Sequence, residues 1–183
     1  MGNPGSKYSK EKRRIIIIGL DDSGKSTLYD HLQNIQPDQS KKKAKHNLDL
    51  NDLKVVTLKM KKLKLMFEKL ASDGHKKALW RHHYTGCQGV IFLVDAVDKS
   101  KFESVKAELN EILADQQLKY TAFAILANKA DLANALTSKE LKQELGLEAY
   151  ADRAVEVFDT NCVNGDGVDL VLEFLTEKMV EFQ

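Results

Sequence analysis

The chain has 183 residues, of which 43% are hydrophobic and 30% charged, and its formal net charge is +1. This length fits one domain with a proper core, and the composition is ordinary for a globular protein. No apolar run is long enough to span a membrane, and the spacing of Cys87 and Cys162 excludes a cysteine-based metal site.

The charge is distributed unevenly along the chain. Residues 1–70 carry 16 Lys+Arg and 8 Asp+Glu, whereas residues 71–183 carry 12 and 19. A basic front half favours an acidic partner such as a lipid surface, and nothing in it indicates nucleic acid. Alternatively, many of these lysines lie on a solvated edge strand, where charge prevents aggregation. Both interpretations remain open.

The first part of the chain predicts an arm, a strand, a helix and a hairpin. Residues 1–12 are polar and predict a flexible arm, followed by a single domain over residues 13–183. RRIIIIG, residues 13–19, is typical of a buried parallel strand. A helix from about Lys25 is expected to stop before Pro37. In residues 53–67, apolar and polar side chains alternate in two successive stretches, which predicts a β-hairpin. The apolar positions expected on one face are Leu28, Leu32 and Ile35 in the helix, and Val56, Leu58, Met60, Leu63, Leu65 and Phe67 in the hairpin, whose turn is Lys61-Lys62.

The remaining strands alternate with helices. Residues 89–96, 121–131 and 154–160 read as buried strands, and the last helix carries an apolar stripe over residues 168–179. This order implies an α/β fold with a mostly parallel six-stranded sheet, helices on both faces and one antiparallel hairpin.

Two capping boxes are expected at helix starts. Ser100 and Glu103 have the spacing of a capping box before the helix that follows residues 89–96. Thr137 and Glu140 have the same spacing at the start of a short helix, which Gly146 is expected to end.

The segment GLDDSGKST, residues 19–27, matches the phosphate-binding pattern G-x-x-x-x-G-K-[ST] between a strand and a helix. Backbone N–H groups of such a loop point at phosphate oxygens, and the helix N-terminus adds positive potential. Lys25 would reach the β- and γ-phosphates, and the Ser26 hydroxyl would bind Mg²⁺. The alternative, a chance glycine-rich turn, does not explain the strand and helix on either side.

The segment NKAD, residues 128–131, identifies the base. It follows the end of a strand, where ligands bind in open α/β sheets. The Asp131 carboxylate can accept hydrogen bonds from two donors of guanine that adenine does not offer as a pair. Asn128 can contact the base edge, and the Lys129 stem can lie on the ring. This pattern disfavours another possible class of protein, the ATP-dependent P-loop kinases.

With these motifs, the chain resembles the Arf, Arf-like and Sar small GTPases. The residues that carry the resemblance are GLDDSGKST, LWRHHYTGCQGVIFLVDAVD, LANKADL and NGDGV. The resemblance implies a Ras-like P-loop G domain, GTP and GDP with Mg²⁺ as ligands, and work at membranes. It also places Cys162 at a small residue whose backbone contacts guanine. The expected nucleotide-binding residues are Gly19, Asp21, Asp22, Ser23, Gly24, Lys25, Ser26, Thr27, Asn128, Lys129, Asp131, Cys162 and Val163.

The two switch segments of the family are altered in this chain. Where the first switch has a metal-binding threonine, this sequence has no threonine between Thr27 and Thr57, and Leu50 falls in its place. The second switch of the family reads D-x-G-G-[QH]. Counting back from Trp80 without gaps aligns residues 69–73 with this motif. Allowing a two-residue deletion instead aligns residues 71–75 with it, which makes His75 a weak catalytic candidate. Both alignments lose the metal-linked aspartate.

These losses predict weakly held Mg²⁺, with Ser26 as the one remaining protein ligand, and slow or absent intrinsic GTP hydrolysis. The interpretation is an Arf-like guanine-nucleotide-binding protein, a peripheral membrane regulator of the trafficking type. The alternative is a nucleotide-bound interaction module that does not switch. In either case effectors or regulators are expected to bind through residues 36–78.

The N-terminus MGNPGSK fits the N-myristoylation pattern, with Gly2 as the acceptor and Ser6 in the required place. One myristoyl chain binds membranes only marginally, so the basic residues that follow would supply the second signal. A polar, unmodified start is the alternative. We expect a cytoplasmic, peripherally membrane-associated monomer.

Overall fold

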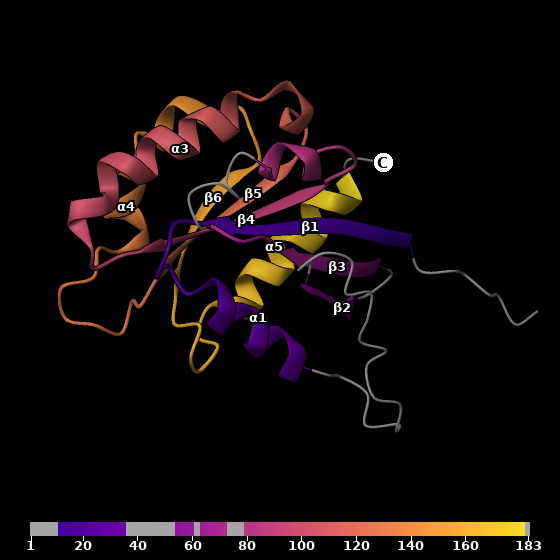
Figure 1. Ribbon diagram of the computed structural model, residues 1–183, viewed down its shortest axis with the longest axis horizontal. Helices are drawn as coiled ribbons and strands as arrows, with labels where there is room; N and C mark the ends of the chain where they lie inside the picture. Colours follow the sequence, from indigo (N-terminus) through magenta and orange to yellow (C-terminus); the bar gives the residue numbers. More distant parts are fainter. Residues whose placement is uncertain (1–10, 36–53, 61–62, 73–78, 182–183) are drawn as a thin grey trace, which may run out of the picture.

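A six-stranded sheet forms the centre of the molecule, with strands in the order β2-β3-β1-β4-β5-β6 (Figure 1). The computed structural model describes residues 11–35, 54–60, 63–72 and 79–181. Neighbouring strands are parallel except for the antiparallel pair β2–β3. The strands are β1 (Glu11–Gly19), β2 (Lys54–Met60), β3 (Leu63–Lys69), β4 (Gly89–Asp95), β5 (Ala122–Asn128) and β6 (Val155–Thr160).

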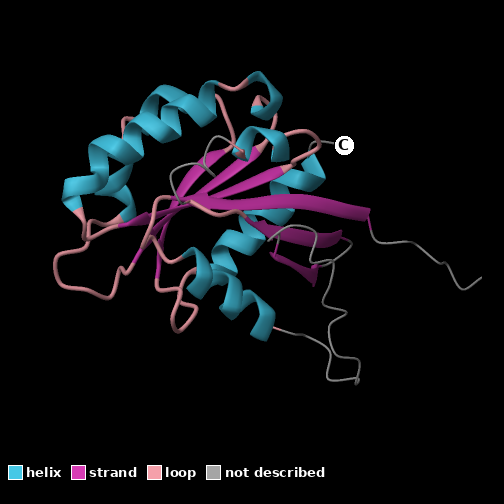
Figure 2. Cartoon of the chain, viewed as in Figure 1, coloured by secondary structure: helices cyan, strands magenta, loops and turns pink. Residues whose placement is uncertain are grey.

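Helices cover both faces of this sheet, as Figure 2 shows in cyan. One face packs on α3 and α4, and the other on α1 and α5. The helices are α1 (Lys25–Asn34), α3 (Phe102–Ala114), α4 (Ser138–Glu144) and α5 (Val168–Glu181), with 3-10 turns at Trp80–His83, Lys99–Lys101, Gln116–Leu118 and Leu147–Tyr150. Within the described ranges, no helix is both long and apolar enough to cross a membrane.

The isoleucine run of β1 is explained by these two layers. Ile16 and Ile18 pack in the cluster that includes α3, whereas Ile15 and Ile17 pack in the cluster that includes α1 and α5. All four side chains are fully buried. Because a central parallel strand is covered on both faces, its sequence does not alternate. The β2–β3 hairpin lies at the sheet edge and does alternate in burial, as predicted.

The structure confirms the predicted α/β fold, with small differences at element ends. Strand β1 begins at Glu11, so two residues of the predicted arm belong to the sheet. Glu11 and Lys12 pair there with Leu63 and Lys64 of β3. Residues 1–10, residues 36–53 and the predicted turn at Lys61-Lys62 lie outside the described residues.

One of the two predicted capping boxes is present. The Thr137 side chain accepts from the backbone N–H of Glu140, whose carboxylate in turn accepts from the Thr137 N–H. The box at Ser100 was a wrong prediction. Ser100 lies inside the turn Lys99–Lys101, and its hydroxyl donates to Asp98 at 2.5 Å. Because that turn precedes α3, the chain has already turned at Ser100 and no side chain caps the helix.

Candidate functional site

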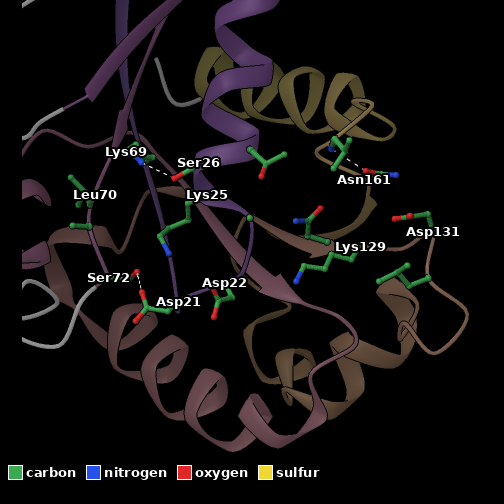
Figure 3. Close-up of a pocket in the computed structure, with 16 residues that line it drawn as sticks. Asp21, Asp22, Lys25, Ser26, Lys69, Leu70, Ser72, Lys129, Asp131 and Asn161 are labelled. Atoms are coloured by element: carbon green, nitrogen blue, oxygen red, sulfur yellow. Dashed lines mark hydrogen bonds between the residues drawn. The ribbon is translucent and has the colours of Figure 1, made fainter.

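A cavity of about 790 Å³ opens at the carboxyl ends of the strands, within the size range of ligand pockets. Its lining comes from the loop after β1, the start of α1, the end of β3 and the loops after β5 and β6. Ligands bind at this edge in open α/β sheets. Figure 3 shows Lys25, Ser26 and Lys69 toward one end and Lys129 and Asp131 toward the other.

The loop after β1 is shaped by two glycines that have positive φ angles. A Cβ at Gly19, with φ of 147°, would lie 2.5 Å from the Leu93 carbonyl oxygen. A Cβ at Gly24, with φ of 102°, would lie 2.2 Å from the Asn128 side-chain nitrogen. Neither position has room for a side chain, so the pattern glycines are required by backbone geometry.

The Lys25 side chain is buried at the first turn of α1. Its Nζ donates to the carbonyl oxygens of Gly19 at 3.0 Å and Leu20 at 2.7 Å. The Ser23 hydroxyl also donates to Leu20, at 2.8 Å. These bonds hold an ammonium group inside the loop that was predicted to bind phosphate, beside the positive end of a helix.

Asn128 ties the two sides of the pocket together. Its side chain is 3% exposed; Nδ2 donates to the Ser23 carbonyl at 2.8 Å and Oδ1 accepts from the Cys162 N–H at 3.0 Å. The sequence suggested that Asn128 contacts the base edge. Because both polar atoms bond to the surrounding loops, Asn128 acts as a positioning residue. Its amide nitrogen keeps a second N–H, and Asn128 lines the cavity, so the predicted contact with the base edge stays a prediction.

Lys129 and Asp131 form the base end of the cavity. Lys129 has a φ of 67°, and its Nζ lies 2.5 Å from Asp95 Oδ2 at the end of β4. The Ala130 N–H donates to the Thr160 carbonyl, which fixes this loop against β6. Asp131 is exposed on the rim. The Lys129 stem is therefore held in place, while the Asp131 carboxylate is accessible to a ligand.

The structure brings ten of the thirteen predicted nucleotide-binding residues to the wall of this cavity. The other three, Gly19, Ser23 and Cys162, do not line it. Cys162 lies 1% exposed behind the wall, and burial raises the pKa of its thiol to about 12. Asn161 and Val163 line the wall beside it. Gly2 and His75 lie outside the described residues.

At the phosphate end, the Lys69 ammonium reaches the hydroxyl that was predicted to bind metal. Lys69 is the last residue of β3, and its Nζ donates to Ser26 Oγ at 2.9 Å (Figure 3). This contact favours the ungapped alignment at the start of the second switch, whose residues 73–78 lie outside the described part of the chain. The residue that reaches Ser26 from the end of β3 is Lys69, as in the ungapped count from Trp80, and not Ala71, whose carbonyl accepts from the Trp80 indole at 2.7 Å.

A second contact joins the same segment to the phosphate loop. The Ser72 hydroxyl donates to Asp21 Oδ1, as the dashed line in Figure 3 marks. Sequence reasoning missed the contacts of Lys69 and Ser72, and it also missed Asp95, the partner of Lys129. The ungapped count from Trp80 already placed Lys69 at the first position of the second switch, but nothing in the sequence indicated the contacts of Ser72 and Asp95.

The residues at this end do not fit a magnesium ion held as in the family. Mg²⁺ requires oxygen ligands in near-octahedral geometry. Ser26 Oγ is bonded to an ammonium group, and Asp21 accepts from Ser72. Nowhere among the described residues do three acidic, histidine or cysteine side chains gather as a metal site. The expected metal role of Ser26 therefore has no supporting ligand set in this part of the chain.

Together, the phosphate loop and the NKAD loop at one edge of this sheet define a P-loop guanine-nucleotide-binding protein with the Ras-like fold. The model of the ADP-ribosylation factor family matches residues 5–179, so the chain belongs to that family. It is an Arf-like GTP-binding protein.

Individual relatives agree with this assignment. The chain is 31% identical over 175 residues to ADP-ribosylation factor-like protein 1 of Saccharomyces cerevisiae, covering 96% of this chain and 92% of the relative. It is 28% identical to the Caenorhabditis elegans protein of the same name, covering 94% and 92%. Among solved structures, the Arl6 BBS3 small GTPase of Trypanosoma brucei with bound nucleotide analogue GppNp matches with a TM-score of 0.78 and 26% identity, covering 93% and 98% of the two chains.

Proposed function

We propose that this Arf-like protein binds guanine nucleotide, hydrolyses GTP slowly or not at all, and acts at a membrane surface as a regulator of trafficking. The observation that carries the proposal is the Lys69–Ser26 contact. Where the family has an aspartate linked to the metal, this chain has a cation. The phosphate loop and the base end keep their expected residues, so nucleotide binding does not depend on what the switches have lost.

Slow hydrolysis follows from what the phosphate-transfer reaction needs. GTP hydrolysis requires an oriented water and neutralised charge on the transferring phosphoryl group. The described part of the second switch, residues 69–72, contains no side chain suited to orient water as the family's glutamine or histidine does. Lys25 remains to bind phosphate. Mg²⁺ is accordingly held weakly at most.

A second candidate function is a nucleotide-bound interaction module that does not switch. It is favoured by the two contacts that join β3 and residue 72 to the phosphate loop, Lys69–Ser26 and Ser72–Asp21. A ligand shifts a conformational equilibrium only if it contacts the two states differently. These two contacts within the chain hold the start of the second switch against the phosphate loop through protein atoms alone, which reduces the difference that GTP could make.

The membrane part of the proposal is supported by a row of lysines across three neighbouring strands, β1, β3 and the edge strand β2. Lys12 pairs with Lys64 across β1 and β3, and Lys64 pairs with Lys59 across β3 and β2. This row continues from the basic N-terminal sequence that contains Gly2. The same observation supports the alternative, because β2 is an edge strand and lysines there prevent pairing with other chains.

The main test is to denature the purified protein, identify any released nucleotide by chromatography, and follow a single turnover of preloaded GTP. We expect guanine nucleotide to be released, and GTP to remain intact far longer than in an intact small GTPase. The matched variant is His75→Ala. Hydrolysis at an ordinary rate, lost on removing His75, would overturn the proposal, and so would ATP competing equally with GDP.

The membrane test uses Gly2→Ala in cells, with membrane and soluble fractions compared by immunoblotting. We expect the variant to become soluble. Lys59→Glu combined with Lys64→Glu should release the protein partly, with a larger effect at low salt, because salt screens charge at a lipid surface. An intact mass from native cells that shows an unmodified N-terminus would rule out the lipid anchor.

A further inference from the structure

The Lys69 side chain occupies a defined place at the phosphate end of the cavity. Its backbone lies between two strands, opposite Ile17 of β1 and Lys54 of β2. Its side chain is on the α1 side, where Nζ is 2.9 Å from Ser26 Oγ and 6.0 Å from the centre of the Tyr29 ring. The lysine is thus held by a central sheet and a helix, and it lines the same cavity as Lys25.

No carboxylate among the described residues lies within ion-pair distance of Lys69. The pKa of its ammonium is lowered, first by burial and then by Lys54, with Asp30 opposing the shift from farther away. A cation that faces a phosphate-binding loop, with no carboxylate of the described residues at ion-pair distance, is placed for an anionic ligand. The bond to Ser26 uses one of its three N–H donors, and two remain.

The charge at this position matches what the family achieves with a metal. An aspartate and a divalent cation together contribute a net charge of +1. A lysine alone contributes the same +1. Exchanging the aspartate for a lysine therefore changes the fixed charge by two units, which equals the charge of the metal ion. The ammonium also bonds to the serine oxygen that would otherwise bind that metal.

We propose that the Lys69 ammonium takes the place of the metal ion and, with Lys25, forms a two-lysine clamp on the β- and γ-phosphates of the bound nucleotide. This inference rests on the proposed nucleotide binding, but it adds a binding residue and its consequence. Lysine is a compact point charge that binds phosphate without fixed geometry, so it can bridge Ser26 and a phosphate oxygen. Nucleotide retention then depends on Lys69 and not on Mg²⁺.

The experiment compares the wild type with Lys69→Met and Lys69→Asp, each loaded with a fluorescent GDP analogue. Release is timed by stopped flow with excess Mg²⁺ and again with EDTA. Binding of Mn²⁺, used as a spectroscopic probe of a magnesium site, is measured by electron paramagnetic resonance. Lys59→Asp is the matched control, because it makes the same change of charge on the neighbouring strand β2, while Lys59 is exposed, pairs with Lys64 and does not line the cavity.

In the wild type and in Lys59→Asp, we expect EDTA to leave the release rate nearly unchanged. Lys69→Met should release nucleotide roughly 10- to 100-fold faster, the usual effect of losing a charge-assisted hydrogen bond. Lys69→Asp should release it rapidly in EDTA, slow down when Mg²⁺ is added, and bind one Mn²⁺ per nucleotide. Circular dichroism checks that each variant is folded. If Lys69→Asp does not fold, the comparison between the wild type and Lys69→Met still tests the clamp.

A wild type whose nucleotide release is strongly accelerated by EDTA, with a rate unaffected by Lys69→Met, would overturn the clamp. In that outcome guanine nucleotide is still bound, so the proposed function survives. If the wild type retains no guanine nucleotide under any condition, the proposed function itself fails. Tight Mn²⁺ binding by the wild type would also show that Lys69 does not replace the metal.

Discussion

The two ends of the cavity differ in how much of the family's chemistry they keep. At the base end, Asn128, Lys129 and Asp131 are all present, and bonds to Ser23, Cys162 and Asp95 hold the first two in place. At the phosphate end the loop is intact, but a lysine stands where the metal-linked aspartate is expected. The comparison teaches that recognition of a nucleotide and chemistry on it are separable, because they depend on different residues.

The largest effect is expected at the base end. Asp131→Asn exchanges a carboxylate for an amide, so guanine loses an acceptor and xanthine gains a donor. We expect GDP affinity to fall by roughly 1,000-fold, since a site built to hydrogen-bond one group strongly rejects another. Competition between GDP and XDP for a fluorescent nucleotide measures the switch. Asp152→Asn is the control, because Asp152 is exposed and does not line the cavity. Unchanged GDP affinity would contradict guanine recognition by Asp131.

The next largest effect tests the connection between the two ends. Gly24→Ala places a Cβ 2.2 Å from Asn128 Nδ2 and strains a residue with φ of 102°. We expect stability to fall by about 3 kcal/mol, as for overpacking with backbone strain. Gly86→Ala is the matched control, because its φ is also positive but no atom lies within 4 Å of the added Cβ; it should cost about 1 kcal/mol. Equal losses in urea denaturation would show that the ends are not in contact.

A smaller effect is expected at the phosphate end. Ser72→Ala removes the donor to Asp21 and should lower stability by about 1 kcal/mol, while the preference for guanine over adenine is unchanged. Ser100→Ala, which removes the hydroxyl bonded to Asp98 on the surface, should have less effect. Thermal denaturation and nucleotide competition measure the two properties. A changed base preference in Ser72→Ala would mean that the ends are not independent.

The smallest effect concerns the two buried thiols. Burial raises the pKa of Cys87 to about 11 and that of Cys162 to about 12. The folded state therefore keeps protons that the unfolded state releases above about pH 9, so stability falls as pH rises from there. The cost is about 0.4 kcal/mol for each thiol at pH 9. The difference between wild type and Cys162→Ala, measured in urea from pH 7 to pH 10, isolates this contribution.

The reaction rates of the same two thiols give a further test of the comparison between the two ends of the cavity. Cys162 lies behind the base end, whereas Cys87 follows the turn at Trp80–His83 and donates to Gly89 at 2.9 Å. Bound GDP should slow the reaction of Cys162 with a thiol reagent and leave Cys87 unaffected. Equal protection of both thiols would point to a global effect of the nucleotide on unfolding and not to local burial.

Local patterns in the sequence predicted most of the fold. The isoleucine run predicted β1, and the alternation of residues 53–67 predicted the two faces of the hairpin. The spacing of Thr137 and Glu140 predicted a capping box that the structure confirms. Each of these signals lies within a few residues. The same rule failed at Ser100, because a 3-10 turn before the helix is not encoded in a two-residue spacing.

The predicted site was limited in a different way. Motifs placed the phosphate loop and the NKAD loop at one edge, but they did not show which side chains reach across the cavity. Lys69 contacts a hydroxyl 43 positions away, and Asn128 bonds to loops 105 and 34 positions away. Such contacts depend on strand register and side-chain direction, which the spacing of motifs along the chain does not give.

The bonds of Asn128 have a consequence for how nucleotide arrives. Because its buried amide joins Ser23 to Cys162, the protein's own hydrogen bonds hold both walls at the base end together. Binding a base there does not have to order two loops, and the entropy that ordering would cost is already lost in folding. The base end is therefore a preorganised receptor, and we expect its association rate to be set by diffusion and orientation and not by loop closure.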